Sequence, residues 1–318
     1  MNSAKNILLL FILGLLLSCD SVESLEFVDL DDRVSKQEVN TQAKLNMPKN
    51  ELVFGFDLRT SPQEDARQYL PFIDYLEKTT GYPFRLNFSS QDQSIIDELG
   101  DSHVDFAFMG AVSFIKANLL YDSIMLVRGK NNQDMTEYRS MIVVRPDSAI
   151  QKIEDLKAKR FAFGGVNSTQ GHLIPRIVLL EHGLKLEDFA DYQFTGSHQN
   201  CAETVIARKA DACGMQDILA ERMAKEGFLR IIHHSRYFPS SGVAVRKDIN
   251  PEIIKQVTSA LLNFDPQGKN RQGLYDWEKT EMSQGFASAQ ASDYEELKNW
   301  AIRIGFIKPV KAQSEAAL

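Results

Sequence analysis

The sequence predicts an α/β protein whose sheets are mainly parallel. Short apolar runs of the length typical of strands alternate with longer segments that have helical periodicity. The body, residues 51 to 309, is long enough for a sizeable core and for two lobes. In such folds ligands bind beyond the carboxyl ends of the strands, so the residues that follow each strand are the first candidates for a site.

The first half of the body opens with a short strand at 52–56. Ser61-Pro62-Gln63-Glu64 then has the form of a capping box with Pro at the first helical position. We expect a helix from there to Thr79, bent at Pro71 and ended by Gly81. The elements expected next are a strand at 84–88, a helix at 91–99, a strand at 104–108, and a helix that Met109-Gly110-Ala111 opens and that runs to about residue 120.

The second half continues the alternation. We expect strands at 140–144, 161–164, 192–195, 213–215, 230–232 and 242–245, a short helical segment at 153–156, and closing helices near 252–263 and 293–304.

The N-terminus has the features of an export signal. Lys5 precedes an apolar run, 7–17, that is too short to span a bilayer as a helix of ~20 residues but suits the hydrophobic region of a secretory signal. Leu16-Leu17-Ser18-Cys19 resembles the bacterial lipobox, which implies cleavage before Cys19 and lipidation of its thiol. The alternative is an ordinary signal peptide with a chance cysteine. Asp20 resembles the residue that retains lipoproteins in the inner membrane of some Gram-negative bacteria, a distinction that disappears in a Gram-positive cell.

The expected domain order is therefore a lipoprotein signal peptide at 1–18, a lipid-anchored polar tether at 19–50, the body, and a polar tail at 311–318. The tether is acidic and has little apolar periodicity. The net charge of −7 argues against nucleic acid as a partner. It does not exclude an anionic ligand, because local dipoles and hydrogen bonds decide that affinity.

Two cysteines remain in the body, Cys201 and Cys213. Exported proteins often pair their cysteines. We nevertheless expect no disulfide, because a position near a helix start and one on the following strand would lie beyond the ~7 Å Cα limit. No spacing typical of metal ligands occurs, so neither a metal nor a cofactor is expected.

Two loop-to-helix junctions in the middle of the chain are the main functional signal. They are Asn167-Ser168-Thr169-Gln170-Gly171 and Gly196-Ser197-His198-Gln199-Asn200, and each follows a short apolar strand. A helix N-terminus presents unpaired N–H groups and about half a positive charge, and adjacent hydroxyls add donors for an oxyanion such as phosphate or phosphonate. A single such turn is as well explained by a simple N-cap at Ser168. Two of them in one αβ unit favour ligand binding.

The order of motifs resembles that of the phosphonate, phosphite and phosphate binding components of bacterial ABC transporters. The resemblance covers residues 51–306 and rests on Tyr75–Gly81, Val104–Gly110, Tyr138-Arg139-Ser140, Ser168–Gly171 and Gly196-Ser197-His198. It implies a type II periplasmic-binding-protein fold, with two α/β lobes joined by two crossing segments and a ligand cleft between them. One lobe would combine 51–137 with 244–310, and the other would be 138–243.

The resemblance also implies roles for individual residues. Ser168 and Thr169 become phosphoryl binders through their hydroxyls and helix amides, His198 a donor to the same group, and Tyr138 a donor from a crossing segment. Gln170 stands where the family often has a third small hydroxyl residue, so we expect a pocket of different size or with one hydroxyl contact fewer.

Further candidates border the expected cleft. Met109 and Gly110 would bring helix amides from the first lobe, or would form only a tight turn. Phe56 ends the first strand and is either a cleft residue or core. Asp217 is a candidate partner for a ligand amine, but no second acidic residue accompanies it near Ser240-Ser241. Phosphite, phosphate or a simple alkylphosphonate therefore fits at least as well as an aminoalkylphosphonate.

The sequence thus predicts a lipid-anchored, extracytoplasmic solute-binding protein, active as a monomer, that captures a phosphorus oxyanion by lobe closure and delivers it to an ABC permease. The alternative is a sensor of the same fold that signals to a membrane receptor or kinase. A hydrolase built on Ser168, His198 and Asp217 is disfavoured, because no Gly-x-Ser-x-Gly elbow surrounds Ser168 and a capping serine is poorly placed as a nucleophile. We therefore expect no enzymatic activity.

Overall fold

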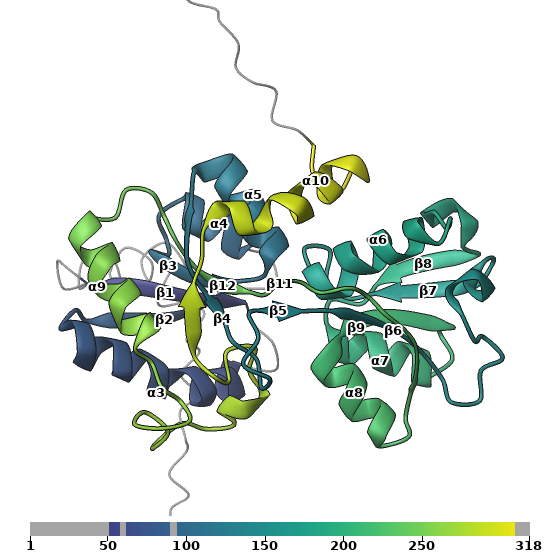
Figure 1. The fold of residues 1–318 in the computed structure, drawn as a ribbon, viewed down its shortest axis with the longest axis horizontal. Coiled ribbons are helices and arrows are strands. Elements are labelled where there is room, and N and C mark those ends of the chain that lie inside the picture. Colours follow the sequence, from purple (N-terminus) through teal and green to yellow (C-terminus); the bar gives the residue numbers. More distant parts are fainter. Residues whose placement is uncertain (1–50, 58–61, 90–93, 309–318) are drawn as a thin grey trace, which may run out of the picture. The chain divides into compact units, whose positions relative to one another are not determined.

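The fold is built on two large β-sheets, each with helices packed on both faces (Figure 1). The computed structural model describes residues 51–57, 62–89 and 94–308. The expectations for the signal peptide, Cys19, the tether and the C-terminal tail fall outside these residues. Within them, no helix is both long and apolar enough to cross a membrane.

The six-stranded sheet and its helices form the first lobe. The strand order is β13-β4-β12-β3-β1-β2. The strands are β1 (Leu52–Asp57), β2 (Phe84–Ser89), β3 (Phe106–Met109), β4 (Ile124–Gly129), β12 (Gly242–Val245) and β13 (Phe286–Ser288). The helices are α3 (Pro62–Thr80), α4 (Ile95–Gly100), α5 (Ala111–Tyr121), α9 (Pro251–Leu262) and α10 (Glu295–Arg303). Helices α3 and α9 pack together on one face, while α5 packs with α4 and α10 on the other.

The five-stranded sheet and its helices form the second lobe, with strand order β10-β6-β9-β7-β8. Its strands are β6 (Ser140–Val144), β7 (Arg160–Phe163), β8 (Asp191–Phe194), β9 (Ala212–Gln216) and β10 (Arg230–His234). A π-helical turn, η2 (Thr169–Leu173), leads into α6 (Ile174–Glu181) on one face of the sheet. The helices α7 (His198–Ile206) and α8 (Asp217–Lys225) lie on the other face (Figure 1).

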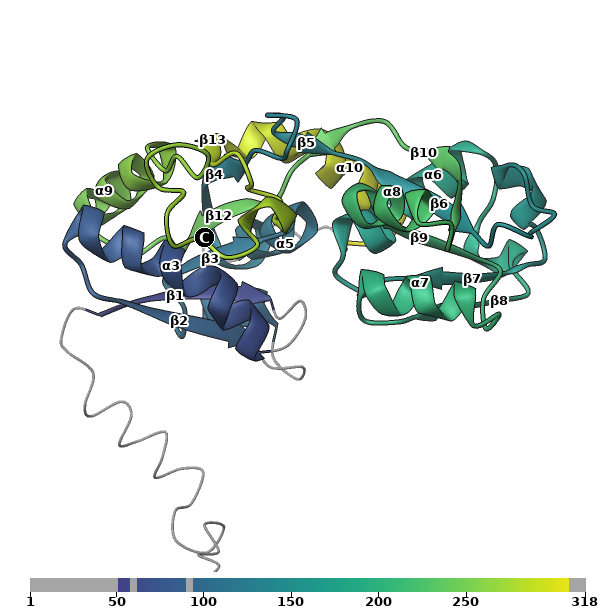
Figure 2. The same cartoon turned by 90° about the horizontal axis from the view of Figure 1, so that it is seen from below.

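Two short strands connect the lobes. β5 (Glu137–Tyr138) lies between β4 and β6 in the chain, and β11 (Phe238–Pro239) lies between β10 and β12. They pair antiparallel, with Phe238 opposite Tyr138. The chain therefore passes from the first lobe to the second and back through one two-stranded ladder, which Figure 2 shows from a second side. This is the pair of crossing segments that the sequence resemblance implied.

The expectation of mainly parallel pairing was wrong. β12 is antiparallel to both β3 and β4, and β6 is antiparallel to both β9 and β10. The connectivity is the reason, since the chain that returns through β11 enters the first sheet against the direction of β3. Among the described residues, parallel pairing is confined to β1 with β2 and β3, and to β7 with β8 and β9.

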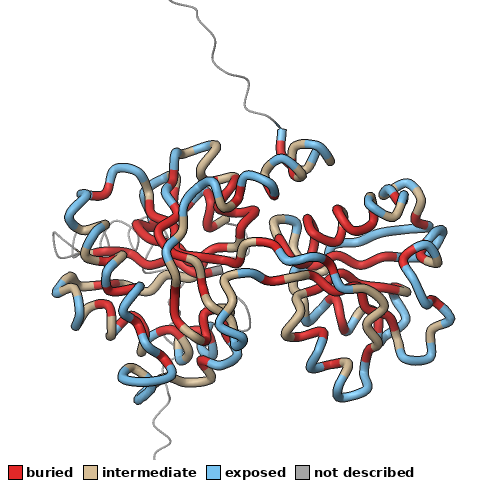
Figure 3. Tube along the Cα trace, viewed as in Figure 1, coloured by how far each residue is buried: buried red, intermediate tan, exposed pale blue. Residues whose placement is uncertain are grey.

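Aromatic side chains dominate the core of the first lobe. Phe54, Phe56, Tyr69 and Phe72 are each at most 1% exposed, and the rings of Phe56 and Tyr69 stack with centroids 4.1 Å apart. Figure 3 shows that the central strands of both sheets are largely buried, whereas β8 at the edge of the second sheet is exposed. Each such ring contributes a large apolar area and a defined geometry, so this lobe offers a rigid support to the loops at its strand ends.

The expectation that Cys201 and Cys213 are unpaired was also wrong. They form a disulfide with their Cα atoms 6.0 Å apart, within the range that a disulfide spans. Helix α7 lies directly on β9, and both cysteines are fully buried at this contact. Sequence spacing suggested a larger separation because it does not reveal how closely a helix packs on the strand that follows it.

Candidate functional site

The first loop-to-helix turn has the geometry of a capped helix start. Ser168 precedes the π-helical turn, and its Oγ accepts a hydrogen bond of 2.9 Å from the Gly171 amide. The Gly164 amide, just after β7, donates to the Gly171 carbonyl at 2.9 Å. π-Helical turns are rare and are often found at functional sites. The turn lies beyond the carboxyl end of β7, where the sequence placed it.

The second turn lies against the first. Gly196 has φ +83°, a conformation that favours glycine, and Ser197 caps α7 by accepting from the Asn200 amide at 3.0 Å. His198 is the first residue of α7, and a Cβ on Gly171 would stand only 2.9 Å from its Cε1. Glycine at 171 thus permits the close approach of His198. The Nδ1 of His198 accepts from the Gln216 amide at 3.3 Å, which fixes the ring over this turn.

A helix of the first lobe points its N-terminus at Thr169. Helix α5 has Gly110 at its N-cap, and glycine has no side chain that could cap the terminal amides. The Val112 amide donates to Thr169 Oγ1 at 2.9 Å, and a Cβ on Gly110 would lie 3.3 Å from the same oxygen. Thr169 from the second lobe is therefore in contact with the positive end of a first-lobe helix.

Tyr138 adds a buried hydroxyl from the crossing strand β5. The residue is 4% exposed, and no group of the described chain lies in hydrogen-bonding geometry with its Oη. Burial, together with the negative charge of Glu281, raises the pKa of Tyr138 far above its ordinary value. The nearby Thr169 and Ser241 side chains and the Ala111 amide act in the opposite direction and lower that pKa. The phenol is therefore a neutral O–H donor at physiological pH.

These groups converge from four segments of the chain. We define the central cluster as Gly110 and Ala111 of the α5 terminus, Tyr138 of β5, Thr169 of η2, and Ser241, which precedes β12. Ser241 is 3% exposed, and its Oγ would lie 4.0 Å from a Cβ on Gly110. The cluster gathers hydroxyl and amide donors with little access to water. Such a set suits a small anion rather than a cation.

Gln170 and Asp217 support the cluster from one side. Gln170 Nε2 donates to the Arg139 carbonyl at 3.0 Å and to Asp217 Oδ1 at 3.2 Å. Asp217 also accepts from the amides of Arg139, at 3.2 Å, and Ile218, at 2.9 Å. Burial raises the pKa of Asp217, and the amide hydrogen bonds oppose that shift. Gln170 thus ties the turn to the crossing strand, in a role that a small hydroxyl residue could not fill.

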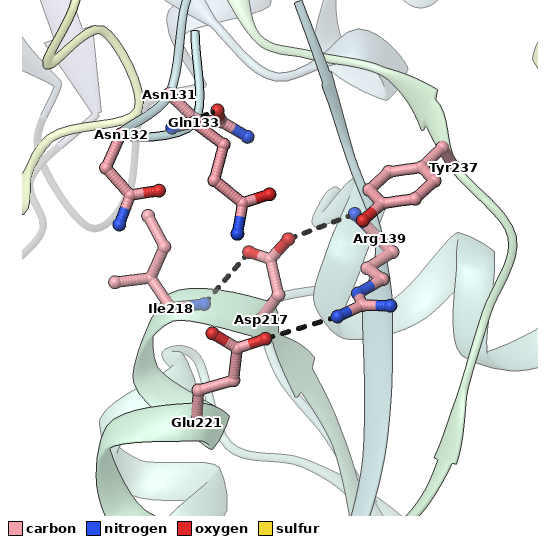
Figure 4. Close-up of a pocket in the computed structure, with 8 residues that line it drawn as sticks. All are labelled: Asn131, Asn132, Gln133, Arg139, Asp217, Ile218, Glu221 and Tyr237. Carbon is pink, nitrogen blue, oxygen red and sulfur yellow. Dashed lines mark hydrogen bonds and ion pairs between the residues drawn. The ribbon is translucent and has the colours of Figure 1, made fainter. Parts of the chain in front are cut away.

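A small polar cavity lies between residues 131–133 of the first lobe and the start of α8, where Asp217 lies. Figure 4 shows Asp217 bonded to Arg139 and Ile218, and Arg139 paired with Glu221. The cavity has a volume of about 20 Å³, which is enough for a single water molecule and too small for an organic ligand. The cavity is lined by Asn131, Asn132, Gln133, Arg139, Asp217, Ile218, Glu221 and Tyr237.

Two candidates belong to the interior rather than to this cluster. Phe56 packs between Phe54 and Tyr69 in the aromatic core, at ring distances of 5.0 and 4.1 Å. Met109 is 1% exposed and pairs with Gly242 in the first sheet. The part of the chain that the structure describes also contains no group of three or more His, Cys, Asp or Glu residues placed to hold a metal ion.

Sequence reasoning missed two members of the site environment. Ser241 carries no motif, and its only signal is a position between the second crossing segment and an apolar strand. Glu281 lies far along the chain, yet its charge acts on both Tyr138 and Asp217. Only the tertiary fold brings these two residues to the crossing strand.

Several known proteins are similar to this chain in sequence. A protein family described as the periplasmic phosphonate substrate-binding protein of ABC transporters matches residues 54–294. The chain is 25% identical to the phosphonates-binding periplasmic protein of Escherichia coli K12 over 223 residues, which is 67% of this chain and 66%, just under two thirds, of that protein. It is 23% identical to a probable ABC transporter phosphite binding protein of Prochlorococcus marinus MIT 9301 over 271 residues, 80% of this chain and 84% of that protein.

The fold is similar to a solved structure as well. The PhnD1 protein of Prochlorococcus marinus MIT 9301, in complex with methylphosphonate, superposes with a TM-score of 0.72 at 20% identity. The match covers 81% of this chain and 99% of that one. At this level of identity the likeness establishes the two-lobed fold.

Proposed function

The chain belongs to the family of periplasmic phosphonate substrate-binding proteins of ABC transporters, and from this premise we propose that it captures a phosphorus oxyanion at the central cluster and delivers it to an ABC permease. The observation that carries the proposal is the Tyr138 hydroxyl, which is buried without a hydrogen-bond partner among the described residues. An unpaired buried donor costs free energy unless a ligand satisfies it. A phosphoryl oxygen is the acceptor that the surrounding donors suit.

The hydrogen-bond donors proposed for the ligand come from both lobes. The α5 terminus, whose N-cap Gly110 has no capping side chain, comes from the first lobe, and Thr169, Ser168 and His198 come from the second. A ligand that bridges them makes its full set of contacts only when the lobes are together. It therefore shifts the population toward the closed form by its differential affinity, which is the mechanism of hinge closure.

The ligand class is phosphonate, phosphite or phosphate. A second acidic group, Glu281, acts electrostatically on Tyr138 and on Asp217. This observation favours including an aminoalkylphosphonate, whose amine would balance these charges, beside the simple oxyanions. The lobe boundaries that we propose for the binding unit are 51–137 with 244–310, and 138–243.

We further propose that the protein is held at the cell envelope by a lipid on Cys19, through the polar tether that follows it. Cys19→Ser should release the protein from membranes or leave it unprocessed, as measured by membrane fractionation and by the mass of the chain. Normal processing together with unchanged membrane association in that variant would exclude the anchor.

Transport is favoured over the two alternatives. The family match is to a transporter component and not to a sensor. For a hydrolase, Ser168 would have to act as a nucleophile, but its Oγ accepts a hydrogen bond from the Gly171 amide as the cap of its own helix.

A thermal-shift panel tests the proposed function. The ligands are phosphate, phosphite, methylphosphonate and aminoethylphosphonate, with sulfate as the comparison anion. A ligand at one hundred times its Kd should stabilise the protein by about 2.7 kcal/mol. If no phosphorus oxyanion raises the melting temperature above the sulfate control, the proposal is wrong.

A further inference from the structure

The C-terminal helix α10 is anchored on the first lobe. Asp293, just before the helix, lies 3.6 Å from Arg128 of β4, and Tyr294 Oη donates to the Ser240 carbonyl at 3.0 Å. Leu297 and Ala301 are fully buried against this lobe's core. The start of α10 therefore has fixed contacts with the first sheet and with the returning crossing segment.

The end of the same helix reaches the second lobe. Arg176 of α6 donates through Nη2 to the Ile304 carbonyl at 3.2 Å. The ring of Phe306 lies 4.5 Å from the ring of His172, which belongs to the π-helical turn. The segment after α10 is thus a third connection between the lobes, made by contacts rather than by the chain.

Lys116 joins this connection from α5. Its Nζ donates to Asn167 Oδ1 at 2.7 Å and stands 5.1 Å from the centroid of the Phe306 ring. The ammonium is half-buried, and this burial lowers the pKa of Lys116. One side chain of the first lobe therefore contacts both the second lobe, directly before Ser168, and the segment that covers His172.

We propose that Lys116, Asn167, His172 and Phe306 form a closure latch, which holds the lobes together and thereby sets ligand affinity without touching the ligand. The inference rests on the proposed function for its effect on affinity. None of the four residues belongs to the central cluster. Their contacts join the two lobes and are lost when the lobes separate, so they add to the stability of the closed form alone.

The contacts of Lys116 determine how much ligand affinity should fall when this side chain is replaced. Lys116→Met keeps the apolar stem but removes a charged hydrogen bond and a cation–π contact at a partly exposed position. We expect affinity for the best oxyanion of the panel to fall about three- to tenfold. The loss should appear in the dissociation rate, because the latch acts after the ligand has docked.

The experiment compares Lys116→Met, Phe306→Leu and their combination with wild type. Lys298→Met is the matched control, because it removes the same charge from α10, where Lys298 pairs with Glu295 of its own helix. Lys116→Arg tests rescue by a residue that keeps the charge and the donor. Three measurements are made: dissociation rate by stopped flow, affinity by calorimetry, and, without ligand, the radius of gyration and hydrogen exchange of residues 166–176 and 300–308.

The latch predicts faster dissociation, a larger ligand-free radius of gyration and faster exchange in both segments for the first two variants. It predicts a non-additive double variant, near-normal values for Lys116→Arg, and no change in the control. Wild-type exchange, size and dissociation in Lys116→Met and Phe306→Leu would overturn the latch, as would an equal loss in Lys298→Met. A wild type that binds none of the panel would instead refute the proposed function, and the ligand-free measurements would still decide the latch.

Discussion

Thr169 makes one of the hydrogen bonds that join the two lobes. Its Oγ1 accepts a hydrogen bond from the Val112 amide of α5, and the residue is 4% exposed. The sequence predicted the importance of this residue because a hydroxyl at a helix start is a local feature. It could not predict the partner, because Val112 is 57 residues away and belongs to the other lobe.

Thr169→Val is expected to weaken oxyanion binding by about 1.5–3 kcal/mol, since it removes a hydrogen bond to a charged ligand while keeping the shape of the side chain. Titration calorimetry with the best ligand of the panel measures the loss. Thr204→Val is the matched control, because the Thr204 hydroxyl donates to the Asn200 carbonyl within α7. Equal affinity of Thr169→Val and wild type would mean that the turn is only a helix cap.

The burial of His172 leads to a prediction about how folding stability depends on pH. Its ring is 5% exposed among Phe163, Phe194 and Phe306, and Nδ1 lies 2.8 Å from the Val166 carbonyl. Burial lowers the pKa of His172 from 6.5 to about 4. The unfolded chain therefore takes up the proton first as the pH falls. The contribution of the neutral, buried His172 ring to the free energy of unfolding is fully present above pH 6.5 and is lost as the pH falls to about 4.

The lowered pKa of His172 corresponds to a loss of about 3 kcal/mol in the free energy of unfolding between pH 6.5 and 4. Urea unfolding at several pH values measures it, with His172→Gln as the comparison, since Gln keeps a donor for the Val166 carbonyl but does not titrate. The variant should show a flatter dependence between pH 6.5 and 4. The same slope in both proteins would show that His172 does not control acid stability.

At the scale of elements, α7 and β9 show both what the sequence predicts and where it fails. Helix 198–206 and strand 212–216 lie close to where the pattern placed them. Their contact, which brings Cys201 and Cys213 into a disulfide, depends on packing that no local pattern encodes. The same limit explains the strand directions, because β12 joins the first sheet through a long-range return from the second lobe.

Replacing both cysteines by serine should lower the free energy of unfolding by about 2–4 kcal/mol, mainly because the unfolded chain regains the freedom of the closed loop. Denaturant unfolding of wild type and of the double variant, each without reductant, gives the difference. Wild type measured with a strong reductant should approach the variant. A difference below 0.5 kcal/mol, roughly the effect of a surface substitution, would contradict a stabilising role for this bond.

At the scale of the whole molecule, the account depends on donors that come from both lobes. The alternation of strands and helices, together with motif order, predicted two lobes and two crossing segments. Tyr138 on the first crossing strand was predicted from its resemblance to a family motif. Ser241 on the return was not, because it has no local signal and acquires its place only when β5 and β11 pair.

Tyr138→Phe tests the central claim most directly, because it removes the buried hydroxyl and keeps the aromatic ring. Titration calorimetry with the phosphorus oxyanions is combined with denaturant unfolding of the ligand-free protein. The account predicts opposite effects: binding weakens by about 1.5–3 kcal/mol, while the free protein is as stable as wild type or more so. Unchanged binding would remove Tyr138 from the site, and failure of every phosphorus oxyanion to bind wild type would contradict the function itself.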